Sequence, residues 1–279
     1  MDSSSPSKIS VIVTTYNWPY ALRSVLTALA AQKSSSPFEI IIADDGSGEE
    51  TAKWVRSFKK MSSIPILHIW QPDEGFRAAA IRNKAILAAE GDYIVFLDGD
   101  CIPRDNFISQ QQALAEPGTF VVGNRILLSR MFTLRALSET LPLHEWPWYR
   151  WMFAWASGHC NRFSPFLPLH FKSLPAKSSS RWQGAKGCNL AVWKADLLKI
   201  NGWEEKFVGW GYEDSDLVIR LLRLGIARKN GRFRIPVIHL WHPESDRAHE
   251  KENWQRFKSR LDEISIASEL GLSQYETHI

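Results

Sequence analysis

The first hundred residues alternate between short apolar runs and helix-like segments, and this alternation restricts the fold more than any other feature. Four runs rich in β-branched and aromatic residues are predicted strands: Ile9–Thr15, Phe38–Ala43, Ile64–Trp70 and Tyr93–Leu97. Predicted helices lie between them, at Pro19–Gln32, Glu49–Lys59 and Gly75–Glu90. Strands joined by helical crossovers pair in parallel, with helices on both faces of the sheet. The sequence therefore predicts an α/β protein built on a mostly parallel, Rossmann-like sheet.

The second half of the chain is less regular. Its predicted elements are a strand near Phe120–Val122, loops and short helices over Leu141–Arg181, helices at Lys194–Ile200 and Tyr212–Leu224, an extended run at Ile235–Leu240, and an amphipathic tail helix from Glu250 to about Leu270. With 279 residues, the chain is long enough to bury one large core.

Charge is distributed unevenly along the chain. The net charge of +4 is too small on its own to indicate nucleic-acid binding, and we expect none. Between Arg125 and Lys186, however, nine Lys or Arg residues stand against two acids, together with five of the thirteen tryptophans. Two interpretations of this segment stay open with equal weight. It contacts an anionic partner at a membrane face, or its tryptophans pack inside as a hydrophobic lid.

Cysteine usage and the amino-terminal residues indicate the compartment. Cys101, Cys160 and Cys188 follow no pairing or metal-binding pattern, which favours reducing conditions. The polar, Ser-rich start lacks the apolar core of a signal peptide, and no apolar run is long enough to span a bilayer. We therefore expect a bacterial-type cytoplasmic protein and leave open a peripheral contact with the inner membrane face. The sequence carries no indication of an oligomeric state.

Two carboxylates one residue apart follow the run Tyr93–Leu97. Ligands bind at the carboxyl ends of parallel strands, so Asp98 and Asp100 lie where a ligand is expected. Their oxygen atoms suit Mg²⁺ or Mn²⁺, ions that are usually shared with substrate phosphates. The alternative is a strand end followed by an Asp-Gly turn, and the motif alone does not separate the two.

Two further groups lie at predicted element ends. Asp44 and Asp45 follow the second strand and can bind a base or ribose, although a turn that caps the next helix explains this motif alone better. Arg77 and Arg82 lie at the start of the Gly75–Glu90 helix, where a diphosphate is a suitable partner. The alternative for this pair is two solvated surface arginines.

Three acids cluster where the helix Tyr212–Leu224 begins, and the helix field there stabilises their charged forms. Asp214 lies one turn from the apolar Leu217 and Val218, at the inner edge of the helix start. A general base that takes a proton from a hydroxyl needs such a position. Ordinary helix capping is the alternative, but three acids exceed what one cap requires.

His239 and His242 follow an apolar run and can complete a metal site begun by Asp100. We favour His239 over His242 as a ligand. A hydrogen-bonded structural role is the alternative for a histidine at a strand end.

These features occur in the order found in family 2 glycosyltransferases of the GT-A fold, and the resemblance covers Ile9 to about Arg247. Val11–Asn17, Asp44–Ser47 and the "DxD" motif Asp98–Asp100 resemble the nucleotide-sugar half of that family. The block from Gly202 to Asp214 resembles the carboxyl-terminal part of β-1,4-galactosyltransferases and chondroitin-type polymerases. Gly75–Asn83 also resembles those polymerases.

The resemblance implies three parts of a GT-A protein. Residues 1–124 would form the nucleotide-sugar-binding half, residues 125–249 the acceptor and catalytic half of the same domain, and residues 250–279 a helical tail. The stretch Leu141–Arg181 has no clear counterpart in the family.

The resemblance also implies roles for single residues. Thr14, Tyr16 and Asp45 would line the uridine pocket with Asp44 nearby, and Arg82 would contact the diphosphate. Asp98 would meet the ribose or the metal, and Asp100 and His239 would bind the metal. Asp214 would be the catalytic base and Glu213 would hold a sugar, while Gly187 and Asn189 would shape the sugar pocket.

The implied activity is an inverting, Mn²⁺- or Mg²⁺-dependent transfer of a hexose. The donor would be a UDP-sugar and the acceptor a hydroxyl of a glycan or glycolipid, as in the biosynthesis of cell-surface polysaccharide or lipopolysaccharide. Polymerases carry two transferase modules and this chain has room for one, which implies a single transfer. The alternative is a non-catalytic nucleotide-sugar or glycan-binding module, which would need no metal pair and no separate acidic helix start.

Overall fold

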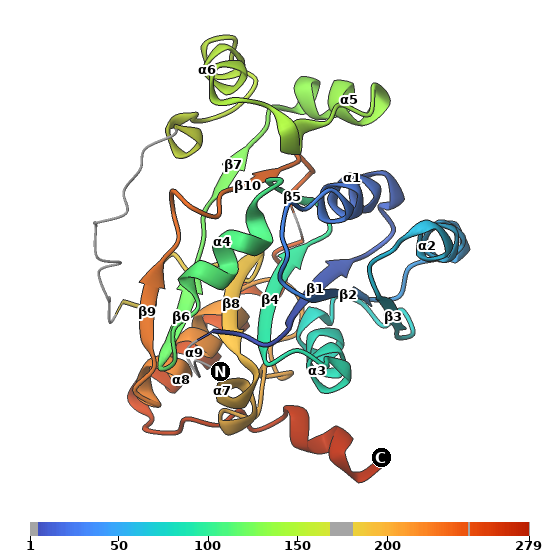
Figure 1. Ribbon diagram of the computed structural model, residues 1–279. Helices are drawn as coiled ribbons and strands as arrows, with labels where there is room; N and C mark the ends of the chain where they lie inside the picture. Colours follow the sequence, from blue (N-terminus) through green and yellow to red (C-terminus); the bar gives the residue numbers. More distant parts are fainter. Residues whose placement is uncertain (1–4, 168–180, 245, 279) are drawn as a thin grey trace.

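The computed structural model describes residues 5–167, 181–244 and 246–278, and its centre is a seven-stranded sheet (Figure 1). The strands lie in the order β3-β2-β1-β4-β8-β6-β9. Their bounds are Ile66–Trp70 (β3), Phe38–Asp44 (β2), Ile9–Thr15 (β1), Tyr93–Asp98 (β4), Asn189–Trp193 (β8), Thr119–Val122 (β6) and Ala227–Asn230 (β9). Only β8 runs antiparallel to its neighbours in this sheet. The prediction of a mostly parallel sheet is therefore confirmed.

A second, three-stranded sheet has the order β5-β10-β7. It consists of Cys101–Pro103 (β5), Val237–His239 (β10) and Arg125–Leu127 (β7). Strand β10 pairs antiparallel with β5 and parallel with β7. Because β5 follows β4 after only two residues, this small sheet joins the carboxyl end of β4 to chain that is more than a hundred residues distant.

Helices cover both faces of the main sheet. Their bounds are Pro19–Ala30 (α1), Glu49–Met61 (α2), Ala78–Ala88 (α3), Phe107–Leu114 (α4), Arg130–Ser138 (α5), Trp148–Ala156 (α6), Lys194–Lys199 (α7), Glu213–Arg223 (α8) and Glu250–Asp262 (α9). Short 3₁₀ turns occur at Leu143–Glu145 (η1), Ser164–Phe166 (η2) and Leu272–His278 (η3). None of the helices in the described part of the chain is long and apolar enough to cross a bilayer.

Two hydrophobic cores form because successive strand residues point to opposite faces. Along β1, Val11 and Val13 pack with α1 on one face, whereas Ile12 packs with α3 and α8 on the other. The same alternation occurs in β2 and β4, whose residues are buried on both faces. This double burial explains why these strands read as continuous apolar runs.

Several predicted bounds need correction. Helix α3 begins at Ala78 because Gly75 has a left-handed φ of 82° and Arg77 has a non-helical backbone before the first turn. Helix α9 ends at Asp262, short of the predicted Leu270. Strand β3 begins at Ile66. The sequence patterns did not reveal the short strands β5, β7, β8 and β9 or the helices α4, α5 and α6 as separate elements. Part of the irregular segment predicted over Leu141–Arg181 lies outside the described residues, and the rest contains η1, α6 and η2.

Candidate active site

A cavity of about 620 Å³ opens where β1, β2 and β4 end. The parallel register places Thr14 beside Asp98 and Thr15 beside Asp44, so three strands deliver polar residues to one edge. Ten of the predicted site residues line this cavity: Thr14, Tyr16, Asp45, Arg82, Asp98, Asp100, Glu213, Asp214, His239 and His242. Four others, Asp44, Arg77, Gly187 and Asn189, are not in its lining.

The end of β4 is held tightly against β1. The Thr14 hydroxyl donates to Asp98 Oδ1 at 2.8 Å, and Arg82 Nη2 donates to the same oxygen at 3.0 Å. The backbone N–H of Gly99 donates to the Thr14 carbonyl at 2.6 Å, and a Cβ atom at Gly99 would lie 2.8 Å from that oxygen. Only glycine allows this approach, which fixes the direction in which Asp98 and Asp100 leave the strand.

The neighbouring acids of β2 have different environments. Asp45 faces the cavity, where its Oδ2 accepts the backbone N–H of Arg77 at 2.8 Å, and desolvation raises its pKa. Asp44 is fully buried. Its Oδ1 accepts the N–H of Ser47 at 2.8 Å, and its Oδ2 lies 2.9 Å from His68 Nε2. Asp44 therefore stabilises the turn, but it does not cap helix α2, whose N-cap is Gly48 without a side-chain hydrogen bond.

Of the two arginines, Arg82 enters the site and Arg77 turns away. Arg82 is buried, with its guanidinium 4.6 Å from the centre of the Trp203 ring, and its Nε and Nη1 have no hydrogen-bond partner among the described residues. Burial opposes its charge, but the carboxylates of Asp98, Asp214 and Glu213 outweigh burial and raise its pKa. Arg77 pairs with Glu74 at 2.7 Å and donates to the Pro72 carbonyl at 3.0 Å.

Glu213 and Asp214 begin α8 and face Arg82 across the cavity. Desolvation, reinforced by the charge of Asp214, raises the pKa of Glu213 to about 7. Desolvation also raises the pKa of Asp214, opposed by Arg82 and by the backbone N–H of Gly187. Asp214 Oδ1 accepts no hydrogen bond from any residue that the structure describes. This oxygen is itself buried and lies against Gly187, whereas Asp214 as a residue lines the cavity, where a carboxylate can act on an incoming O–H donor.

Gly187 and Asn189 act around the cavity rather than in its lining. A Cβ atom at Gly187 would lie 2.4 Å from Asp214 Oδ1, so glycine is required for Asp214 to keep its position. Asn189 is buried, and its Nδ2 donates to the carbonyls of Asn124 and Ile235 at 3.2 and 2.7 Å. Asn189 thus ties β8 to the segments that enter β7 and β10.

Asp100 lies close to two histidines that line the same cavity as Asp98. Asp100 Oδ2 lies 3.6 Å from His239 Nε2 and 3.3 Å from His242 Nε2. Burial lowers the pKa of His239 despite the nearby Asp100, which leaves the ring neutral with a lone pair to donate. One carboxylate oxygen and two imidazole nitrogens form a donor set that fits Mn²⁺ or a similar divalent ion.

Cys101 lies beside this group and was not predicted. Its sulfur and the ligand atoms of Asp100 and His239 all lie within 4.8 Å of one another, because β5 pairs Cys101 with His239. Burial raises the pKa of the Cys101 thiol well above its usual range, so it stays protonated and points toward Asp100 Oδ1 at 3.4 Å. A protonated thiol is a weak ligand, so the carboxylate and the histidines are the better donors.

The cavity is also lined by aromatic and charged residues that the sequence patterns did not indicate as site residues. The additional lining includes Trp18, Phe76, Arg125, Lys186, Trp210, Tyr212 and Glu250. Trp210 and Tyr212 lie in the stretch directly before helix α8. Glu250 comes from α9, and no local pattern connects the tail to this cavity.

Residues 10–173 match the family described as glycosyl transferase family 2, and residues 168–242 match the N-terminal domain of galactosyltransferase. The first match covers more than half of the chain, and the chain therefore belongs to glycosyl transferase family 2. Both matches end before α9.

Among curated proteins, the chain is 30% identical over 229 residues to the hyaluronan synthase of Pasteurella multocida, a match to 78% of this chain and 23% of the relative. It is 29% identical over 224 residues to the chondroitin synthase of Escherichia coli, covering 78% of this chain and 32% of the relative. The chain thus spans about a quarter to a third of the length of these relatives.

Among solved structures, GalNAc-T7 with UDP, GalNAc and Mn²⁺ superposes with a TM-score of 0.64 at 14% identity. The superposition covers 93% of this chain and 48% of that one. A likeness at this identity concerns the fold, and it confirms the predicted GT-A architecture.

Proposed function

We propose that this member of glycosyl transferase family 2 transfers a hexose from a UDP-sugar to a hydroxyl group of a glycan or glycolipid, with inversion at the anomeric carbon. One observation carries the proposal. A single cavity is lined by the Asp98–Arg82 pair, by the group of Asp100 and two histidines, and by Asp214. A binding module would not need all three.

The donor would bind along the strand ends. Thr14, Tyr16 and Asp45 lie at the ends of β1 and β2, where a nucleoside is recognised in related α/β architectures. Arg82 lines the cavity beside Asp98, and the carboxylates of Asp98, Asp214 and Glu213 favour its positive charge. A planar guanidinium suits a diphosphate, so we assign the charged part of the donor to Arg82.

Asp100, His239 and His242 would hold the divalent ion, with Asp98 as a further candidate. When bound, such an ion neutralises charge that develops on a departing diphosphate. The similar fold of GalNAc-T7, solved with UDP and Mn²⁺, supports this assignment of donor and metal.

Asp214 would act as the general base. The Asp214 carboxylate takes the proton of the acceptor hydroxyl while the hydroxyl oxygen forms a bond to the anomeric carbon. The bond between the anomeric carbon and the phosphate oxygen breaks, and its electron pair leaves on the diphosphate beside Arg82. Glu213, with a pKa of about 7, would hold a sugar hydroxyl as donor or acceptor of a hydrogen bond.

The division of the chain follows from these assignments. Residues 1–124 carry the donor side, residues 125–249 the acceptor side and the base, and residues 250–279 the tail. The cavity takes lining residues from all three parts, so the parts form one site rather than independent units.

The acceptor side has an exposed apolar surface on α5 and α6, which lie together beyond the small sheet (Figure 1). Trp151 is fully buried and stacks on Phe166 at 4.4 Å, as a hydrophobic lid requires. Large apolar side chains around it are nevertheless exposed: Met131, Leu134, Trp148, Tyr149, Phe153 and Trp155. The two interpretations of this segment therefore apply to different faces of the same helices.

We propose that this exposed face rests on the anionic inner membrane surface, as an enzyme that glycosylates a lipid-linked acceptor in the cytoplasm requires. Arg130 and Arg150 lie on the same two helices and complement anionic headgroups, whereas Arg135 is already paired with Glu139. Co-sedimentation with vesicles of phosphatidylglycerol and phosphatidylcholine tests this part. Binding that disappears in Trp155→Ser/Phe153→Ser protein supports it, and no binding to anionic vesicles contradicts it.

A donor screen tests the proposed reaction. Purified protein with Mn²⁺ is incubated with UDP-, GDP- and dTDP-sugars, and released nucleotide is measured with and without EDTA. We expect slow release from one UDP-sugar that EDTA abolishes, together with a donor-induced rise in Tm. Absence of both release and binding would favour the non-catalytic binding module.

A further inference from the structure

Helix α9 lies beyond the last residue that matches either family description, yet it contacts the cavity and the start of α8. We infer that α9 is a positioning element for Glu213 and Asp214, and that Asn253 is its central positioning residue. This inference rests on the proposed function for its catalytic meaning. Its structural basis is a set of contacts that hold the chain on both sides of the two acids.

The first contact is made by Asn253, which is buried on α9. Its side-chain amide donates to the carbonyls of Val208 and Trp210 at 2.9 and 3.3 Å. Both N–H groups of the amide are thus used on the stretch directly before α8. No helix or strand includes residues 208–212, so these side-chain bonds supply part of the fixation that secondary structure supplies elsewhere.

This stretch needs fixing because its backbone is unusual. Gly209, Gly211 and Tyr212 all have left-handed φ angles, of 74°, 117° and 69°. Tyrosine rarely adopts this conformation, and it persists only where the surroundings enforce it. Tyr212 is the residue immediately before Glu213, so its backbone angles set the direction in which Glu213 and Asp214 leave the loop.

The second contact holds Tyr212 itself. Its ring stacks on Phe257 of α9, with centroids 5.7 Å apart and planes 17° apart. The ring of Trp254, one turn earlier on the same helix, lies 5.1 Å from the Tyr212 ring and 6.2 Å from the Phe257 ring, between centroids. Phe257 is fully buried, so the ring that supports Tyr212 is anchored in the core.

The third contact lies after the two acids. Arg260 Nε donates to Asp216 Oδ1 at 3.0 Å, and Asp216 is fully buried. The other Asp216 oxygen accepts from Arg220 Nε at 2.8 Å. Asn253, Phe257 and Arg260 therefore hold residues 208–210, 212 and 216, which enclose Glu213 and Asp214 from both sides.

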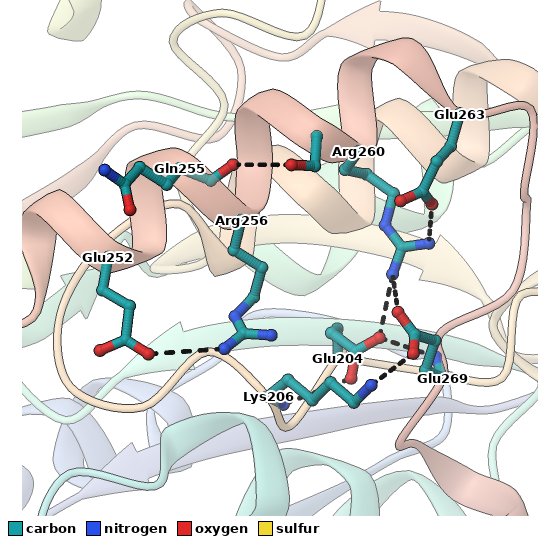
Figure 2. Close-up of a pocket in the computed structure, with 9 residues that line it drawn as sticks. Glu204, Lys206, Glu252, Gln255, Arg256, Arg260, Glu263 and Glu269 are labelled. Carbon is teal, nitrogen blue, oxygen red and sulfur yellow. Dashed lines mark hydrogen bonds and ion pairs between the residues drawn. The ribbon is translucent and has the colours of Figure 1, made fainter.

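A charged pocket of about 340 Å³ beside α9 belongs to the same arrangement (Figure 2). Figure 2 shows Arg260 reaching from the helix to Glu204, Glu263 and Glu269. Glu204 also accepts the backbone N–H groups of Glu269 and Leu270 at 2.7 and 3.1 Å. The ion pairs of Arg260 attach α9 to the chain around residues 204 and 269. Because the charged groups of the pocket are already paired with one another, we do not propose a ligand site there.

The test replaces the amide donors without changing side-chain size. Asn253→Asp presents a carboxylate oxygen to the two carbonyls and should displace the loop. Asn253→Ala removes the donors without adding charge. This second variant serves as the test if Asn253→Asp does not fold. Lys258→Ala on the exposed side of α9 is the surface control. Val55→Ala, in the core of α2 near the opposite edge of the sheet, controls for a general loss of stability.

We expect kcat for sugar transfer to fall by about 10- to 100-fold in Asn253→Asp, since small displacements of reacting groups have effects of this size. The KM for the donor should change by less than about threefold, because the strand-end contacts remain. Hydrogen exchange followed by mass spectrometry should show faster exchange across residues 208–216. Val55→Ala should lower Tm without either change.

An unchanged kcat in both Asn253 variants would overturn the inference. So would an equal loss of kcat in Val55→Ala at the same fall in Tm. Wild-type protein that neither binds nor turns over a donor would instead overturn the proposed function. Faster exchange across residues 208–216 in Asn253→Asp would then still support α9 as the element that fixes this backbone.

Discussion

The two sides of the cavity are built in different ways. On the side that we propose for the donor, Thr14, Asp45 and Asp98 lie at the ends of buried parallel strands, and their positions follow from strand register. On the side that we propose for the acceptor, Glu213 and Asp214 follow a loop with left-handed residues that α9 holds in place. The donor side is fixed by regular secondary structure, whereas the acceptor side depends on side-chain contacts between distant segments.

This difference has an energetic counterpart. Asp98 pairs with Arg82 and Thr14, so its charge is compensated. Glu213 and Asp214 lie next to each other with raised pKa values, which means that the fold holds two carboxylates where their charged forms are disfavoured. Strain and uncompensated charge of this kind concentrate at functional sites.

The strongest effect is expected for Asp214→Asn, which breaks the acceptor side alone. Asparagine keeps the shape but cannot take a proton, so kcat should fall by about 10³-fold or more, within the range for loss of a general base. Donor affinity should change little, because the strand-end contacts are untouched. Steady-state transfer rates and isothermal titration with UDP measure the two quantities. Near-normal turnover in this variant would remove Asp214 from the role of base.

Removal of the metal site should break the donor side. His239→Ala and Asp100→Ala take away ligands of the proposed site, and we expect transfer to fall by about 10²-fold, with a higher Mn²⁺ concentration needed for half-maximal rate. His242→Ala should have a smaller effect, because this side chain is more exposed than His239. Mn²⁺ titrations of the three variants give the ranking. Equal activity with and without EDTA in wild-type protein would rule out the metal assignment.

The raised pKa of Glu213 predicts that ionisation of its carboxyl group destabilises the fold, although activity requires ionised carboxylates at this site. Its pKa is about 7 in the folded protein and 4.5 ordinarily, so ionisation destabilises the fold above pH 7, and the destabilisation fades as pH falls toward 4.5. Glu213→Gln removes this cost and should raise stability by about 2 kcal/mol at pH 8, with a vanishing gain near pH 4.5.

Thermal unfolding of Glu213→Gln and wild-type protein between pH 4.5 and 8 measures this difference. The same carboxylates predict the pH dependence of activity. Because a base must be ionised, kcat/KM should fall as pH decreases through the raised apparent pKa values of the Glu213–Asp214 pair. A Tm gain that is constant across this pH range would contradict the assigned environment of Glu213.

The smallest effects are expected for donor binding when Arg82 or Arg77 is replaced. Arg82→Ala should weaken donor binding by about tenfold or more, since Arg82 brings a positive charge to the cavity lining. Arg77→Ala should weaken it less, because the Arg77 side chain pairs with Glu74 and Pro72 outside the cavity lining. Titration with UDP gives both values. A larger loss for Arg77 would mean that this loop rearranges when the donor binds.

The sequence predicted the donor side well because its signals are local. The buried strand that is followed by Asp98-Gly99-Asp100 positions these carboxylates directly. Four apolar strands joined by helical crossovers define the parallel part of the sheet. Even there, the strand-end pattern alone did not distinguish Asp44 from Asp45, and only the family resemblance placed Asp45 in the pocket with Asp44 nearby. Adjacent residues at a strand end point in opposite directions, and only the register of the finished sheet shows which one meets the cavity.

The acceptor side was less predictable for physical reasons. Strand β8 is five residues long and antiparallel, and β9, Ala227–Asn230, is a polar edge strand without apolar alternation. Cys101 joins the group of Asp100 and His239 through a strand pairing across more than a hundred residues, and Glu250 reaches the cavity from the tail helix α9. The acids of α8 were predicted as candidates from their clustering, but the support that α9 gives them has no local signal.

The stereochemistry of transfer tests the central claim most directly. The claim is that Asp214 activates the acceptor for one displacement at the anomeric carbon, with no covalent intermediate. Proton NMR of the product formed in early turnover, with water as acceptor if no glycan is accepted, reports the anomeric configuration before it equilibrates. The account predicts a configuration opposite to that of the donor. A product with the donor's configuration would contradict it.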